Sequence, residues 1–194
     1  DRWQHKLFII EGIKLIDEAL ENNVNIRNVL YSGKLLTTND GAEFLKRIES
    51  YGKPINVSES IFQEISDTEN TQGVIAIVEF NIRPLDEIFH RSNGFFIYLN
   101  GIQDPGNMGT IIRSADAFNI DGIMIGEGCV DPYNAKVVRA TMGSIFRTPL
   151  YFVDNDRETL TSIIANSFKL YATHLEGSIS NYDLNYEGKY FRYG

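Results

Sequence analysis

The feature that most constrains the fold is a continuous apolar run, Phe95-Phe96-Ile97-Tyr98-Leu99, followed by a polar loop rich in Gly and Pro. A strand that is apolar at every position is typical of a parallel sheet covered on both faces, because a strand with one wet face alternates. The loop runs from Asn100 to Gly109, and helical periodicity follows over 110–118. The segment predicts a strand, loop and helix unit of a parallel α/β domain.

The same alternation continues to the end of the chain. Apolar β-type segments are expected as strands at 122–125, 148–152 and 169–173, with the beginning of a further strand at 188–193. Helical patterns separate them at 134–142 and 156–167. Strands that alternate with helices predict a mostly parallel sheet wound by right-handed crossovers.

The first eighty residues predict a smaller α/β sandwich. Expected strands are 7–10, 26–31, 54–57 and 74–80, and expected helices are 13–21, 41–50 and the segment from Ser58, as N-cap, through Ile65. One part is ambiguous, because the apolar positions from Leu7 to Leu20 also recur near helical spacing. Gly12 breaks that pattern and favours a strand followed by a helix.

Residues 81–93 separate the two halves. They contain Pro84, several charges and a short apolar turn, which indicates a linker with a helical piece. The expected organisation is a first domain at 1–80, a linker at 81–93 and a second domain at 94–194.

Composition bounds the class of protein. Of the 194 residues, 43% are hydrophobic and 23% charged, which is ordinary for a soluble globular chain. There is no apolar run of the ~18 residues that span a bilayer, and no secretory leader pattern. A single cysteine, Cys129, excludes an internal disulfide framework and fits a reducing compartment. We therefore expect a cytoplasmic protein.

The formal net charge of −8 argues against a nucleic-acid partner. Nucleic-acid binders usually carry a basic excess, because neutralising phosphates releases counterions. Residues 1–79 hold eight Lys and Arg against thirteen Asp and Glu. Basic side chains that could still form local patches are Lys34, Lys46, Arg47, Lys53, Arg113, Lys136, Arg139 and Arg147. Charge alone leaves the question open.

The segment from Asn100 to Arg113 is the most informative for chemistry. Its three glycines permit close backbone approach, and the start of the following helix offers free N–H groups to an anion. With Asn107 in the loop and Arg113 on the helix, a bound phosphate or ribose could meet both. The pattern is neither G-x-G-x-x-G nor a P-loop. A purely structural interpretation is also open, in which Asn107 caps the helix and Arg113 reaches a carboxylate such as Asp116.

Residues Asn107 to Phe118 resemble the first motif of the SpoU (TrmH) family of RNA ribose methyltransferases, in the SPOUT class of knotted enzymes. Segments 123–126 and 137–147 agree with the same family. In the first half, 8–12 and 71–76 are similar to the family's N-terminal RNA substrate-binding domain, which is akin to a ribosomal-protein fold. The resemblance implies an α/β chain with a small N-terminal sandwich and a mostly parallel, Rossmann-like SPOUT domain that is knotted when complete.

The resemblance also implies an activity. Family members transfer a methyl group from S-adenosylmethionine to a ribose 2′-hydroxyl, and those with this extra domain usually act on ribosomal RNA. Arg113 is then the principal catalytic residue, and Asn107 positions it or the ribose. A guanidinium is essentially never deprotonated in proteins, so we expect Arg113 to orient the substrate and stabilise charge rather than act as a general base.

Further assignments follow from the resemblance. Residues implied in binding the methyl donor are Thr173, His174 and Gly194, although His174 could equally be an exposed loop residue. Expected RNA contacts are Arg139, Arg147 and Lys34, and for the two arginines simple surface charge is the alternative. Homodimer formation is also implied. No metal is expected, because His5, His90 and Cys129 have no companions at ligand spacing.

Two family motifs do not occur in this sequence. They are a strand that runs into Gly-x-Glu-Gly, and an Ile-Pro-Met turn with a Ser-Leu-Asn helix, which together form the knot and most of the donor pocket. We therefore expect a C-terminally incomplete methyltransferase domain that binds S-adenosylmethionine poorly. An RNA-binding or dimerising module without catalysis is the alternative, and a Rossmann-like nucleotide-binding protein is a third option.

Overall fold

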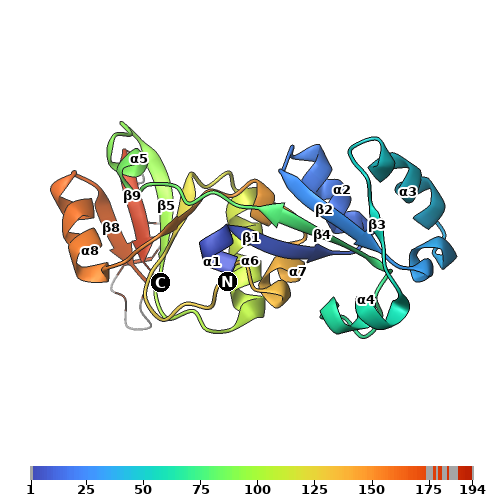
Figure 1. Ribbon diagram of the computed structural model, residues 1–194. Helices are drawn as coiled ribbons and strands as arrows, with labels where there is room; N and C mark the ends of the chain where they lie inside the picture. The colour runs from blue at the N-terminus through green and yellow to red at the C-terminus, as the bar shows by residue number, and fades with distance from the viewer. Residues whose placement is uncertain (1, 174–176, 178, 181–182, 184–187, 194) are drawn as a thin grey trace. The chain divides into compact units, whose positions relative to one another are not determined.

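The computed structural model describes residues 2–173, 177, 179, 180, 183 and 188–193, and its contacts divide the chain into two compact units (Figure 1). The first unit consists of Asp1–Asn81 and Tyr133–Phe146, and the second of Ile82–Pro132 and Arg147–Gly194. Residues 133–146 thus pack with the first unit, although they follow much of the second unit along the chain.

The first unit contains a four-stranded sheet in the order β1-β4-β2-β3. Its strands are β1 (Leu7–Glu11), β2 (Ile26–Tyr31), β3 (Ile55–Asn56) and β4 (Val74–Glu79). Its helices before residue 81 are α1 (Arg2–His5), α2 (Ile13–Glu21), the 3₁₀ turn η1 (Gly33–Thr37), α3 (Gly41–Glu49) and α4 (Glu59–Ile65). Strand β4 is antiparallel to both β1 and β2, whereas β2 and β3 are parallel.

Local sequence signals explain where these helices begin. Gly12 has a φ of 98°, and the helix α2 starts directly after it, which confirms the strand-then-helix interpretation of this segment. The backbone N–H of Ile13 donates to Gln72 Oε1 at 3.0 Å, so a distant side chain satisfies the start of α2. As expected, Ser58 caps α4 by accepting from the N–H of Ile61.

An aromatic cluster holds residues 133–146 in the first unit. The rings of Phe80 and Tyr133 stack with centroids 4.0 Å apart, and Phe8 lies 4.9 Å from Tyr133. After Tyr133 come α7 (Ala135–Thr141), capped by Asn134, and the short 3₁₀ turn η2 (Ser144–Phe146). Buried aromatic pairs add packing energy beyond their area, so this cluster accounts for the grouping.

The second unit is built on a five-stranded sheet in the order β7-β6-β5-β9-β8, in which every pair is parallel. The strands are β5 (Gly94–Leu99), β6 (Gly122–Ile125), β7 (Leu150–Phe152), β8 (Lys169–Ala172) and β9 (Lys189–Tyr193). The helices are α5 (Asp86–Phe89), α6 (Pro105–Ala117) and α8 (Asp156–Ala165). The sequence prediction of a mostly parallel sheet is confirmed, with the apolar run 95–99 at its centre.

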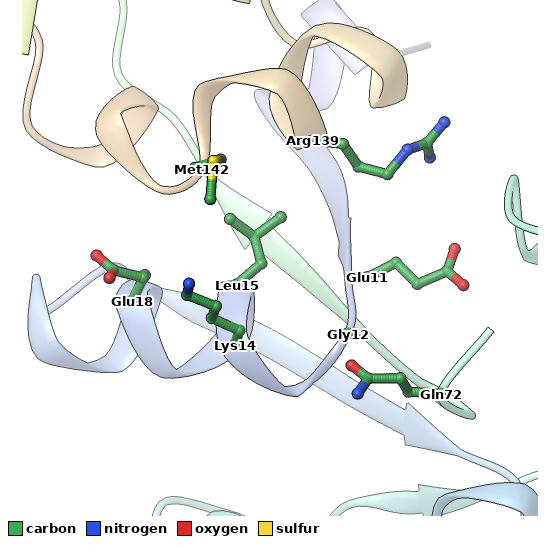
Figure 2. A pocket seen from close by; sticks show the side chains of 8 residues that line it. All are labelled: Glu11, Gly12, Lys14, Leu15, Glu18, Gln72, Arg139 and Met142. Carbon is green, nitrogen blue, oxygen red and sulfur yellow. The ribbon is translucent and has the colours of Figure 1, made fainter. Parts of the chain in front are cut away.

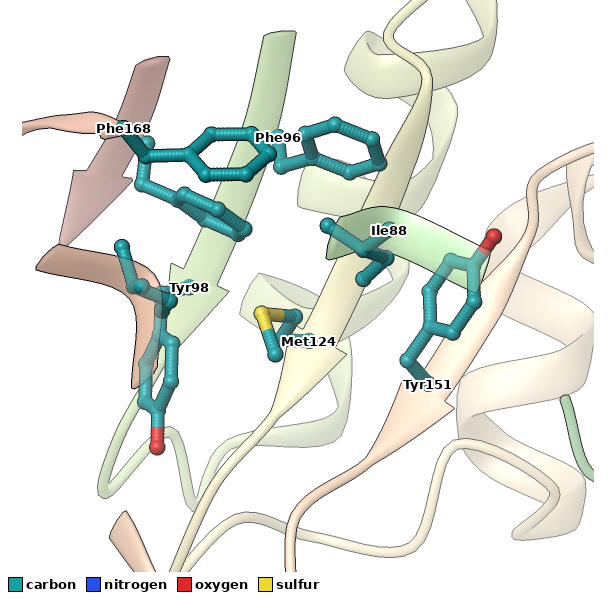
Figure 3. Close-up of a cluster of buried hydrophobic side chains, with 8 residues drawn as sticks. Ile88, Phe96, Tyr98, Met124, Tyr151 and Phe168 are labelled. Carbon is teal, nitrogen blue, oxygen red and sulfur yellow. The ribbon is translucent and has the colours of Figure 1, made fainter. Parts of the chain in front are cut away.

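One face of this sheet carries a buried cluster (Figure 3). Its members are Ile88, Phe96, Tyr98, Met124, Tyr151, Ile163, Phe168 and Phe191. The fully buried Phe191 ring lies 5.1 Å from the Phe96 ring and 4.9 Å from the Phe168 ring, centroid to centroid. Strand β9 therefore completes this core between β5 and β8.

Candidate active site

Helix α6 starts five residues earlier than the sequence periodicity predicted. It begins at Pro105, and the N-cap Asp104 accepts a hydrogen bond from the backbone N–H of Asn107 at 2.7 Å through Oδ1. An acidic N-cap followed by Pro at the first helical position is a strong start signal. The prediction that Asn107 lies in the loop is therefore wrong. Asn107 lies in the first helical turn, and Asp104, not Asn107, is the cap.

Asn107 and Arg113 are both solvent-exposed on this helix. Six residues of α-helix separate them by about 9 Å along the axis and about 120° around it. The opposite face is buried and fixes the helix on the sheet through Met108, Ile112 and Ala115. Both side chains are thus free to meet a ligand, but from different sides of α6.

The ion pairs at α6 differ from the alternative in which Arg113 reaches the carboxylate of Asp116. Asp116 forms an ion pair with Arg147, with Nη2 and Nε at 2.8 and 2.9 Å from Oδ2. Among the residues that the structure describes, no ion pair involves the guanidinium of Arg113. An exposed cation without a protein partner suits contact with an anionic ligand.

A cavity of about 580 Å³ lies in the second unit between β5 and α6. The side chains Phe95, Ile97 and Leu99, which alternate along β5, form one wall of it, and Thr110 and Ser114 of α6 are also in the lining. Thr173, expected to contact the methyl donor, lies at this cavity. The other two expected donor contacts, His174 and Gly194, lie outside the described residues.

The basic residues expected to contact RNA are divided between the units, with Arg139 and Lys34 in the first and Arg147 in the second. In the first unit, Arg139 lines a pocket of about 170 Å³ with Lys14, but Glu11 and Glu18 line it too (Figure 2). Lys34 has an exposed side chain, and its backbone N–H donates to the Glu59 carboxylate at 2.8 Å. Balanced charge in the pocket leaves no local basic excess there.

Two negative findings bound the chemistry of the described residues. They contain no group of three or more His, Cys, Asp or Glu side chains that could hold a metal ion. No helix among them is long and apolar enough to cross a membrane.

The fold and site together define a parallel α/β domain with an exposed Asn and Arg on the helix after its central strand, preceded by a smaller mixed α/β domain. Residues 94–192 match the model of the SpoU rRNA Methylase family, and residues 1–76 match the MRM3-like substrate binding domain. The chain therefore belongs to the SpoU rRNA methylase family.

Individual relatives agree with this membership. The chain is 28% identical to the 23S rRNA (guanosine(2553)-2′-O)-methyltransferase RlmP of Bacillus subtilis over 91% of this chain, and spans 66% of that protein. A crystal structure of an rRNA methyltransferase from Sinorhizobium meliloti superposes with a TM-score of 0.80 at 30% identity, covering 100% of this chain and 73% of that one.

The SpoU methyltransferase AviRb of Streptomyces viridochromogenes, solved in complex with the cofactor AdoMet, gives a TM-score of 0.82 at 25% identity. That match covers 99% of this chain and 74% of AviRb. Because the chain spans slightly less than two thirds of the Bacillus relative, about a third of that protein has no counterpart in these residues.

Proposed function

We propose that this chain is part of an enzyme that transfers a methyl group from S-adenosylmethionine to a ribose 2′-hydroxyl of ribosomal RNA. The observation that carries the proposal is α6, which presents Asn107 and Arg113 to solvent in a domain of the SpoU family, with no ion pair to Arg113 from any residue that the structure describes. The names of the curated relatives, which methylate riboses of 23S rRNA, support the substrate class.

The roles of the two side chains follow from the chemistry. Methyl transfer to a hydroxyl is an in-line displacement, so the enzyme must hold the 2′-oxygen in line with the methyl group. Arg113 binds the phosphate beside the target ribose and fixes the ribose through that contact, because its guanidinium stays protonated. Asn107 donates to or accepts from the ribose or its phosphate at the other side of α6.

The residues of the second unit fit part of a methyl donor. The cavity at β5 and α6 has an apolar wall that suits an adenine ring, and the Thr110, Ser114 and Thr173 hydroxyls offer hydrogen bonds. Among the described residues, those that line this cavity are all uncharged, so they offer no ion pair to the methionine end of the donor. When bound, the donor supplies an electrophilic methyl group on a sulfonium.

The first domain, residues 1–80, serves in this proposal as the RNA-binding part, with residues 81–93 as linker and 94–194 as the methyltransferase part. Its match to a substrate binding domain supports that role. Arg139, Arg147 and Lys34 are proposed as phosphate contacts. A homodimer in the cytoplasm, as in the expectation from the sequence, completes the proposal.

A transfer assay tests the proposed function. The natural protein is incubated with S-adenosylmethionine labelled in the methyl group and with ribosomal RNA from cells that lack the protein. Label in alkali-stable dinucleotides is expected, because a 2′-O-methyl blocks cleavage of the next phosphodiester. Arg157→Ala, at an exposed arginine on α8 of the same unit, is the matched control for Arg113→Ala. Label in the bases, or no label, would contradict the proposal.

A further inference from the structure

Asp156 lies where the ends of several strands of the second unit meet. It is the first residue of α8, and α8 follows β7. The strands β5, β6 and β7 are parallel neighbours, so their carboxyl ends and the loops after them share one edge of the sheet. Sequence reasoning missed this residue, because only the folded sheet brings it to the loop that leads into α6.

The carboxylate of Asp156 accepts hydrogen bonds from two other strands or their loops. Tyr98 Oη on β5 donates to Oδ1 at 2.6 Å, and Asn100 Nδ2 after β5 donates to Oδ2. The backbone N–H of Glu127, after β6, lies 3.2 and 3.3 Å from the two oxygens. Figure 3 shows that the Tyr98 hydroxyl points away from the buried cluster, so this ring spans from the core to the carboxylate.

Backbone hydrogen bonds join the same two loops directly. The N–H of Gly101 donates to the carbonyl of Glu127 at 2.9 Å, and the N–H of Val130 donates to the carbonyl of Ile102 at 2.7 Å. The carboxylate also fills the space beside Gly126, where a Cβ would lie 2.7 Å from Asp156 Oδ1. Loop 100–104 is therefore held against loop 126–131, with Asp156 between their ends.

Helix α6 begins directly after the first of these loops. Asn100 is four residues before the N-cap Asp104, and the first turn of α6 carries Asn107. We propose that Asp156 is a positioning residue for methyl transfer, which fixes the entry of α6 and thereby the places of Asn107 and Arg113. This inference rests on the proposed function, since Asp156 acts on the reaction only through α6.

Cys129 offers a built-in reporter for this arrangement. It is the one cysteine of the sequence, and it is partly buried in loop 126–131. Burial raises the pKa of its thiol, backbone N–H groups of Ile102 and Gly101 act in the opposite direction, and the Asp156 charge raises it further. Cys129 directly precedes Val130, whose N–H donates to the Ile102 carbonyl in the loop that leads into α6. Its alkylation rate therefore reports whether the two loops stay together.

The test compares Asp156→Ala and Asp156→Asn with Asp154→Ala, a control at an exposed carboxylate two residues earlier. Each is made in the natural protein. Methyl transfer is measured as kcat and as KM for RNA, and Cys129 alkylation by iodoacetamide is followed by mass spectrometry of its peptide. Alkylation is compared at a pH above the midpoint of each variant's own curve of rate against pH, so that the lower thiol pKa on loss of the Asp156 charge does not itself change the rate. For Asp156→Ala we expect faster alkylation and a kcat lowered by about tenfold or more at little change in KM, as for a misplaced catalytic group.

Asp156→Asn keeps the shape of the side chain and one oxygen that accepts hydrogen bonds, but its NH2 group faces donors that the carboxylate accepted from. It is therefore expected to show smaller changes in the same directions. It decides the matter if Asp156→Ala does not fold. Unchanged alkylation in the folded variants would overturn the claim that Asp156 holds loop 100–104 against loop 126–131. Faster alkylation with an unchanged kcat would overturn the positioning role. Lack of methyl transfer by the unsubstituted protein would contradict the proposed function instead. The role of Asp156 in holding the two loops together would then be judged by the alkylation rate alone.

Discussion

The start of α6 gives a prediction whose size follows from one hydrogen bond. Asp104→Ala removes the acceptor for the Asn107 N–H and the negative charge at the helix N-terminus. Loss of an N-cap costs about 1 kcal/mol, and loss of the favourable charge adds about 0.3–1 kcal/mol at an exposed site. A total of about 1–2 kcal/mol raises the population of the opened first turn by about 5- to 30-fold.

Amide hydrogen exchange of the peptide that covers residues 105–112 measures this opening. Its protection is expected to fall by about that factor in Asp104→Ala, since local opening controls exchange. Asp104→Asn keeps an oxygen acceptor and loses only the charge, so its protection is expected to fall by about 2- to 5-fold. Equal exchange in wild type and Asp104→Ala, or an equal effect of both variants, would refute the capping argument.

Three further predictions concern stability and reactivity. Phe191→Ala is expected to lower the unfolding free energy by about 3–5 kcal/mol, measured by urea denaturation, because it empties a fully buried site, and a loss below about 1 kcal/mol would contradict the packing. Gly73→Ala is expected to destabilise the first unit by more than about 1 kcal/mol in the same assay, because φ at this position is 77° and the added Cβ would lie 2.6 Å from the Leu35 nitrogen. A variant as stable as the wild type would contradict this argument. Asp156→Asn is expected to lower the pKa of Cys129, because the substitution removes a negative charge that raises this pKa. The midpoint of the alkylation rate against pH therefore moves to lower pH, and a midpoint at higher pH would refute the effect of the Asp156 charge on the thiol.

Much of the fold could be predicted from the sequence because local pattern and tertiary structure agree there. The apolar run 95–99 predicts a strand of a parallel sheet, and it lies in the middle of that sheet. The start of α6 was placed too late because Gly106 and Gly109 suggested a loop. The Asp104-Pro105 pair, which was available in the sequence, is the stronger signal for the start of a helix.

The candidate site could be predicted only in part. Asn107 and Arg113 were found through a family motif, and their exposure on one helix is consistent with that assignment. The ion pair between Arg147 and Asp116 joins side chains 31 positions apart, and no local pattern indicates it. The same holds for Asp156, whose donors Tyr98 and Asn100 are more than 50 residues away in the sequence.

The grouping of residues 133–146 with the first unit has a similar cause. A division of the chain by sequence assumes that domains follow one another, whereas the stacking of Phe80 on Tyr133 joins residues that are far apart in the chain. Such contacts depend on tertiary packing, which hydrophobic periodicity does not encode.

The most direct test of the central claim is a map of 2′-O-methylated riboses in the ribosomal RNA of cells that lack this protein. The account predicts that a ribose methyl is lost, that the wild-type gene restores it, and that Arg113→Ala does not restore it although the variant is folded and present. Arg157→Ala is expected to restore it fully. An unchanged methylation map in the deletion strain, or full restoration by Arg113→Ala, would contradict the account.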